Sequence, residues 1–147
     1  MATDEMHPTR TQRSQHEYMF TAKHHGGGSR SDACWSPQVT RDGEFSVFDL
    51  ADLHSIADDG GWLYGVLRDS NHGLRDLGTW GQQIAEFPKA NEGVPWHGFP
   101  IWAVNNEAPP NRAAETLRPS KEVFQQMEKV GLITRRERKR LYKGDHA

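Results

Sequence analysis

Apolar and polar residues are arranged at two places along this chain in ways that predict short strands. Residues 44–48, EFSVF, largely alternate polar and apolar side chains, which is the period of a strand with one buried face. Residues 62–67, WLYGVL, form a continuous apolar run of strand length between glycine and polar residues. We therefore expect two short strands in the first half of the chain.

Two further stretches carry the signals of short helices. Residues 49–58 place leucine and isoleucine side chains on one helical stripe, with Asp49 as the expected N-cap. Thr79 and Gln82 form a capping-box pattern, which predicts a helix over residues 80–87 that ends at a proline. We expect both helices to pack with the predicted strands.

The strongest local signals lie near the C-terminus. Ser120 and Gly131 bracket an amphipathic stretch and predict a helix over residues 121–130. Residues 134–137 form a second capping box, which predicts a last helix over residues 135–143. Two helices joined by a short turn form an αα-hairpin. Together these elements predict a small α+β domain with short strands and about four short helices, ending in this hairpin.

Residues 93–102, GVPWHGFPIW, are the part of the chain richest in large apolar side chains. Two prolines exclude a helix interior and favour an extended segment, either an edge strand or a rigid loop. Trp96, Phe99 and Trp102 are either core side chains or the side chains that line a pocket or an interface. His97 lies between two aromatic residues, and it is either a buried core histidine or a functional group.

Composition separates a polar N-terminal segment from the rest of the chain. Only 35% of the residues are hydrophobic and the mean hydropathy is -0.84, yet the chain contains five Trp, three Tyr and six Phe. That aromatic content favours a packed core over a disordered chain. Residues 1–40 are polar and contain a glycine-rich run, so we expect a flexible segment there and a single globular domain over residues 41–147.

The single cysteine, Cys34, excludes an internal disulfide framework and a zinc site built from several cysteines. Histidines of the N-terminal segment match no ordered metal-ligand spacing, so we expect neither a metal nor a cofactor. The N-terminus lacks the apolar region of a secretory signal, and no window approaches the length of a membrane span. A cytoplasmic protein without a membrane contact is the simplest interpretation.

The net charge of -2 hides two charge runs of opposite sign. Residues 42–69 contain seven acidic side chains and one basic one, whereas residues 134–143 contain six basic side chains and one glutamate. The six basic residues are Arg135, Arg136, Arg138, Lys139, Arg140 and Lys143. The two runs either neutralise each other within the molecule or serve different partners.

Clustered Arg and Lys on one helix indicate either a solvated C-terminal helix whose basic end suits the helix dipole or a helix that binds a polyanion. Neutralising nucleic-acid phosphates releases counterions and needs no sequence-reading geometry. Glu137 stands where a helix-turn-helix motif would need an apolar anchor, so contact with the phosphates is the better hypothesis. We therefore predict a small binding protein whose helix over residues 134–143 contacts nucleic-acid phosphates or an acidic protein partner. The sequence does not predict an oligomeric state.

An enzyme is the first alternative. His97 could act as general acid or base, with Glu107 or Asp49 as its orienting carboxylate and Arg112 as the stabiliser of an anion. Together with the basic helix, these residues would form a small metal-independent hydrolase or nuclease.

A protein-interaction module is the second alternative, of the kind found in antitoxins and immunity proteins. The acidic residues 42–69 would suit a partner with a basic surface. Exposed aromatic side chains of residues 93–102 would supply the anchors of such an interface.

Overall fold

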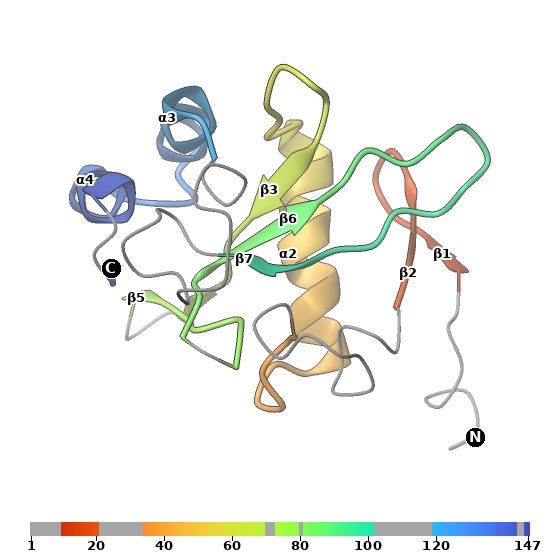
Figure 1. Cartoon of the computed structure of the whole chain (residues 1–147), viewed down its shortest axis with the longest axis horizontal. Coiled ribbons are helices and arrows are strands. Elements are labelled where there is room, and N and C mark those ends of the chain that lie inside the picture. The colour runs from red at the N-terminus through yellow and green to blue at the C-terminus, as the bar shows by residue number, and fades with distance from the viewer. Residues whose placement is uncertain (1–9, 21–33, 70–72, 80, 102–118, 144–145) are drawn as a thin grey trace, which may run out of the picture.

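The computed structural model of the chain (Figure 1) describes residues 10–20, 34–69, 73–79, 81–101, 119–143 and 146–147. Within these ranges the protein is a small α+β domain with three helices and antiparallel strands, where the sequence predicted about four helices. The helices are α2 (Arg41–His54), α3 (Lys121–Lys129) and α4 (Arg135–Lys143). None of these helices is long and apolar enough to cross a membrane.

The strands form one three-stranded sheet and two hairpins. The sheet has the order β3–β6–β7, and both pairings are antiparallel. Its strands are β3 (Leu63–Gly65), β6 (Ile84–Phe87) and β7 (Phe99–Ile101). The two hairpins are formed by β1 (Arg10–Gln12) with β2 (Glu17–Met19) and by β4 (Arg68–Asp69) with β5 (Gly73–Leu74). Figure 1 shows the β1–β2 hairpin at one end of the molecule and α3 and α4 at the other.

The three-stranded sheet separates two hydrophobic clusters. On β6, Ala85 and Phe87 belong to the cluster on the α2 side, whereas Ile84 packs with residues of α3 and α4. On β3, Leu63 belongs to the first cluster and Tyr64 to the second. This alternation follows from the two-residue period of a strand, so each buried face of the sheet is covered by different helices.

The predicted strand over residues 44–48 is wrong, because these residues lie inside α2. Thr40 caps the helix by accepting a hydrogen bond from the Gly43 amide at 3.0 Å. The predicted helix over residues 49–58 covers only the second half of α2, and Asp49 lies within the helix instead of at its N-cap. The buried positions are Glu44, Val47, Phe48, Ala51 and Asp52. Their spacing is that of one helical face, which a five-residue window cannot distinguish from a strand.

The predicted helix over residues 80–87 is also wrong, because its second half is the central strand β6. All four residues of β6 are buried, so the chain shows no polar–apolar alternation there. The carbonyl of Gln82 accepts hydrogen bonds from the amides of Leu77 and Gly78, which makes a turn in place of the capping box that Thr79 and Gln82 predicted. Burial on both faces of the sheet outweighs the local helix signal.

The predictions for the strand over residues 62–67 and for an extended aromatic stretch are confirmed. The first contains β3, and the second contains β7. Among the described residues β7 pairs only with β6, so Pro100 lies on an edge strand, where a missing amide donor is tolerated. Trp96, just before β7, forms a bridge with Tyr18 of β2.

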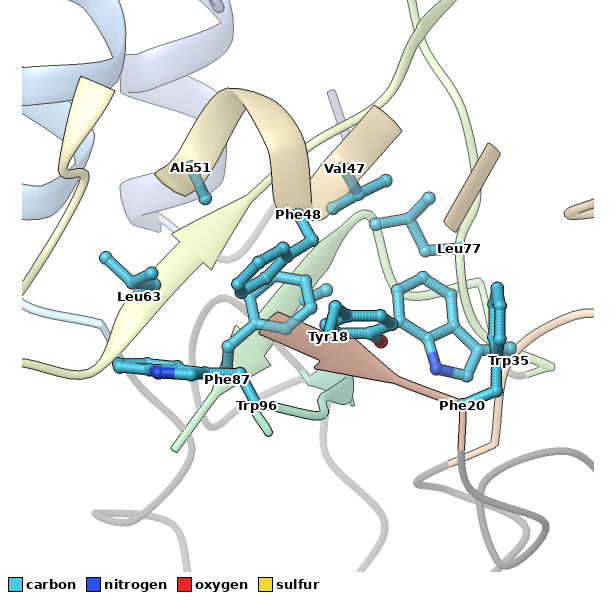
Figure 2. Close-up of a cluster of buried hydrophobic side chains, with 11 residues drawn as sticks. Tyr18, Phe20, Trp35, Val47, Phe48, Ala51, Leu63, Leu77, Phe87 and Trp96 are labelled. Carbon is cyan, nitrogen blue, oxygen red and sulfur yellow. The ribbon is translucent and has the colours of Figure 1, made fainter. Parts of the chain in front are cut away.

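Residues from the N-terminal forty contribute to the core of the domain. Tyr18 has no exposed surface, and Phe20, Cys34 and Trp35 are each less than 8% exposed. Figure 2 shows Tyr18 among the rings of Phe48, Phe87 and Trp96, which come from α2, β6 and the segment before β7. The polar composition of this segment therefore does not separate it from the hydrophobic core, because a few large side chains supply its buried contacts.

Candidate functional site

Local capping and two apolar side chains hold the basic helix α4 in place. Thr134 accepts a hydrogen bond from the Glu137 amide at 3.1 Å, and Glu137 accepts one from the Thr134 amide at 2.8 Å. This reciprocal pair is the capping box that the sequence predicted. Leu141 is buried, and Tyr142 meets Phe124 of α3 edge to face at 6.0 Å. These contacts leave the opposite side of α4 to solvent.

That solvent side of α4 carries five exposed cations, which we call the cationic face. They are Arg135, Arg136, Lys139, Arg140 and Lys143. At about 100° per residue they fall within an arc of about 140°, and Leu141 lies on the opposite side of the helix. No ion pair or hydrogen bond joins these five side chains to another described residue. The positive charge of this face is therefore not neutralised within the described part of the chain.

Arg138 differs from the other basic residues of α4. It is half-buried, and its Nε donates a hydrogen bond to Glu128 at the end of α3. This ion pair joins the two helices, so we assign Arg138 a structural role. Of the six basic residues that the sequence singled out, the other five form no ion pair or hydrogen bond with a residue that the structure describes.

Glu137, the only acidic residue of α4, is engaged by the β4–β5 hairpin. Arg68 donates hydrogen bonds to the Glu137 carboxylate and to the Leu132 carbonyl. Partial burial opposes ionisation of Glu137, but hydrogen bonds from Thr134 and Arg68 outweigh it and lower the pKa of this carboxyl. Glu137 is thus held in its charged form by partners outside the cationic face.

Three of the seven acidic residues in 42–69 are engaged at the β1–β2 hairpin, away from α4 (Figure 1). Asp49 forms a two-point ion pair with the guanidinium of Arg13, at 2.6 and 2.7 Å, and this pair raises the pKa of Arg13. Asp52 bonds to the β1–β2 turn, and Glu44 accepts a hydrogen bond from the Tyr18 hydroxyl at 2.5 Å. These three carboxylates therefore have partners in the β1–β2 hairpin, and none of them covers the cationic face.

Two buried tyrosines, one on each side of the sheet, donate hydrogen bonds to carboxylates. Burial, followed by the nearby charge of Glu44, raises the pKa of Tyr18 well above its ordinary value. The Tyr64 hydroxyl lies 2.9 Å from Asp58 and 3.1 Å from Glu86. Burial and these two carboxylates likewise raise the pKa of Tyr64. Both phenols are therefore neutral donors over the physiological range.

The aromatic residues of the predicted pocket lie in different surroundings. Trp96 is only 6% exposed and packs against Phe48 of α2, so its side chain belongs to the core. Phe99 is half-buried and packs against the cluster formed with α3 and α4. Trp102 lies outside the described residues. The structure thus places Trp96 and Phe99 in the two separate hydrophobic clusters on either side of the sheet.

Of the three predicted catalytic residues His97, Glu107 and Arg112, only His97 lies within the described residues. His97 is half-buried in the connection between Trp96 and β7. Glu107 and Arg112 lie outside the described residues, so their positions relative to His97 are not part of the structure. Among the described residues, no three side chains of His, Cys, Asp or Glu are gathered closely enough to hold a metal ion.

A different histidine forms an oriented pair with a buried carboxylate. Nδ1 of His16, in the β1–β2 turn, lies 2.6 Å from Oδ1 of Asp52, whose side chain is fully buried in α2. The imidazole packs against the Trp96 ring at 4.8 Å and borders an open hollow of about 450 Å³. Sequence reasoning missed this pair because 36 residues separate its members and His16 lies in a polar segment. The apolar Tyr-Met-Phe run just after His16 was the one signal that this segment docks onto the domain.

Comparisons of this chain with protein-family models, with curated proteins and with solved structures find no match.

Proposed function

We propose that this protein binds nucleic acid through the cationic face of α4. The observation that carries the proposal is that five exposed cations share one side of the helix without an ion pair to a described residue. Clustered cations gain binding free energy from phosphates by releasing counterions, whatever the base sequence.

The helix dipole favours Arg140 and Lys143 in the last turn of α4, but it does not explain the other cations of this face. Arg135 and Arg136 lie in its first turn, where the helix dipole disfavours positive charge. The one cation that bridges α4 to its neighbour is Arg138, which lies off this face. With a net charge of -2, the whole molecule does not attract polyanions in general. Binding would therefore be confined to this side of the protein.

Of the alternative functions, neither gains support from a specific contact. A partner that docks on acidic residues 42–69 would find Glu44, Asp49 and Asp52 already engaged in internal hydrogen bonds. The hydrolase centred on His97 needs Glu107 and Arg112, which lie outside the described residues. Binding to an acidic protein uses the same face of α4, so the experiment below includes it as an outcome.

The test compares two double variants with equal loss of charge. Arg136→Ala with Arg140→Ala removes two cations from the cationic face, and Lys121→Ala with Lys129→Ala removes two exposed cations from α3. Fluorescence anisotropy with labelled duplex DNA and single-stranded RNA gives the binding constant at several salt concentrations. In a plot of log K against log salt, we expect the α4 variant to lower the slope by about 1.4 to 1.8, or about 0.7 to 0.9 for each lost phosphate contact. The α3 variant should keep the wild-type slope.

Equal binding by both double variants would contradict the proposal. Binding of the wild-type protein to polyglutamate, but to neither nucleic acid, would assign the cationic face to an acidic protein instead. Circular dichroism of each variant checks that α4 still folds, which we expect because its anchor Leu141 and its capping residues are unchanged.

A further inference from the structure

The His16–Asp52 pair has the geometry of a base held in one orientation. Asp52 accepts three hydrogen bonds: from Nδ1 of His16 at 2.6 Å, from the Gln15 amide at 2.6 Å and from the His16 amide at 3.0 Å. An ionised carboxylate only accepts, so Nδ1 carries the proton in this contact. The neutral ring then has its lone pair on Nε2, directed away from Asp52. This is the arrangement in which a carboxylate orients a histidine for proton transfer.

The hollow beside His16 is large enough for part of a nucleotide. It lies between the β1–β2 turn and the connection from β6 to β7, and its volume of about 450 Å³ is within the usual range for ligand sites. The His16 side chain is 40% exposed towards solvent, with Trp96 packed against its ring. Lys89 lines the same hollow. The imidazole of His16 therefore borders the hollow, and Lys89, whose ammonium nitrogen lies beside Gly61, is the one Lys or Arg among the described residues that line it.

The geometry points to a ribonuclease site in which His16 is the general base. RNA supplies its own nucleophile, the 2′-hydroxyl, so the protein has to supply a base for the 2′-proton, a proton for O5′ and a cation for the charge on the phosphate oxygens. Nε2 of His16 removes the 2′-proton, O2′ forms a bond to phosphorus, and the bond from phosphorus to O5′ breaks. O5′ takes up a proton through Nε2 or water, while Lys89 stabilises the charge on the phosphate oxygens. The products are a 2′,3′-cyclic phosphate and a 5′-hydroxyl, with no net gain or loss of protons.

The hollow itself should bind phosphate weakly. Glu17 and Glu92 also line it and repel an anion. Affinity for a long RNA would therefore come from the cationic face of α4, and in this respect the inference rests on the proposed function. Figure 1 places the β1–β2 hairpin and α4 at opposite ends of the molecule, so only a long strand could reach both. A dinucleotide tests the His16 site apart from α4.

The experiment measures cleavage of a dinucleoside monophosphate and of a longer RNA in the presence of EDTA. Chromatography identifies the cyclic phosphate, and DNA of the same sequence should remain intact because it lacks the 2′-hydroxyl. His16→Ala should lower kcat about 100-fold or more on both RNA substrates. His54→Ala removes an exposed histidine from the end of α2 and should keep wild-type activity. Added imidazole should restore part of the activity of the His16→Ala protein, which a purely structural role of His16 would not produce.

Asp52 provides the second variant, because it positions His16 without reaching the substrate. Asp52→Asn should lower kcat by about tenfold or more with KM unchanged. Thermal melting of both variants checks that the β1–β2 turn still docks on α2. A wild-type protein that cleaves neither substrate, or a folded His16→Ala protein as active as wild type, would overturn the inference.

Failure of this site and failure of the cationic face give different results. Retention of long RNA without cleavage would overturn the His16 site and leave the proposed function intact. Cleavage of the dinucleotide by a protein that shows no salt-dependent RNA binding would support the His16 site and overturn the proposal for α4.

Discussion

The side chain of Gln126 in α3 forms a closed pair of hydrogen bonds with the backbone of Ala57. Its Oε1 accepts from the Ala57 amide at 3.0 Å, and its Nε2 donates to the Ala57 carbonyl at 2.8 Å. Ala57 lies in the connection between α2 and β3, where it also bridges to Leu63. One amide side chain thus satisfies both backbone groups of a residue that is 69 positions away.

Gln126→Leu should therefore destabilise the domain although leucine favours a helix. The substitution leaves two partly buried backbone groups of Ala57 without partners, at an expected cost of about 1–2 kcal/mol. Gln125→Leu changes an exposed neighbour on the same helix and should stay within about 0.5 kcal/mol of wild type. Urea unfolding curves of the two variants measure the difference, and equal midpoints would contradict the assigned role of Gln126.

Gly65→Ala should be strongly destabilising. A Cβ at this position of β3 would lie 2.6 Å from the Val47 carbonyl oxygen, so α2 can pack this closely only against a glycine. Moving a helix backbone costs more than moving a side chain, and we expect a loss of about 3 kcal/mol or more. Gly43→Ala is the matched control, because its Cβ would meet only ordinary contacts and alanine favours the helix by up to about 1 kcal/mol. Thermal melting should thus shift in opposite directions for the two variants.

Protonation of Glu137 should make the domain less stable in acid. Its pKa is lowered from 4.5 in the folded protein. A group of this kind stabilises the fold above its unfolded pKa, and its contribution is lost as the pH falls through the folded value. Glu137→Gln should therefore flatten the decrease in unfolding free energy below about pH 4.5, measured by urea titration at several pH values. Glu122→Gln, at an exposed position in the first turn of α3, is the control and should leave more of that decrease in place.

Ionisation of Tyr18 and Tyr64 should make the domain less stable in alkali. Burial and nearby carboxylates raise both phenol pKa values above 10.0, so the folded protein holds these protons more tightly than the unfolded chain. The stabilisation is complete below about pH 10 and decreases above it, by up to about 1.4 kcal/mol per pH unit for each group. In a Tyr142→Phe background these are the only tyrosines. Phenolate absorbance should then rise only when the protein unfolds, and a rise near pH 10 in the folded state would contradict the prediction.

The elements that the sequence predicted well are those with short-range signals. The bounds of α4 follow from Thr134 and Glu137, which lie three residues apart and bond to each other. Ser120 occupies the N-cap position of α3, although its side chain forms no capping hydrogen bond, and Pro100 indicated an edge position for β7. In each case the residues that decide the structure are neighbours in the chain, so their pattern is visible without knowledge of the fold.

The parts that sequence reasoning missed depend on distant partners. The helical face of α2 is defined by what covers it, including Tyr18 of β2, and residues 44–48 alone fit a strand equally well. Strand β6 is buried on both sides, so polar and apolar residues do not alternate along it, and its sequence does not distinguish a strand from a helix. His16 acquires a possible chemical role only through Asp52 and Trp96. No short-range sequence pattern predicts that these three residues lie next to one another.

The bridge between Tyr18 and Trp96 has a consequence for the order of events on the ribosome. Tyr18 is synthesised before Trp96, whose backbone bonds to Glu17 and Met19 on either side of Tyr18. A nascent chain that stops short of Trp96 lacks the segment that pairs with β2, and it lacks one member of the hydrophobic cluster that contains Tyr18. The aromatic core can therefore close only after Trp96 has been translated.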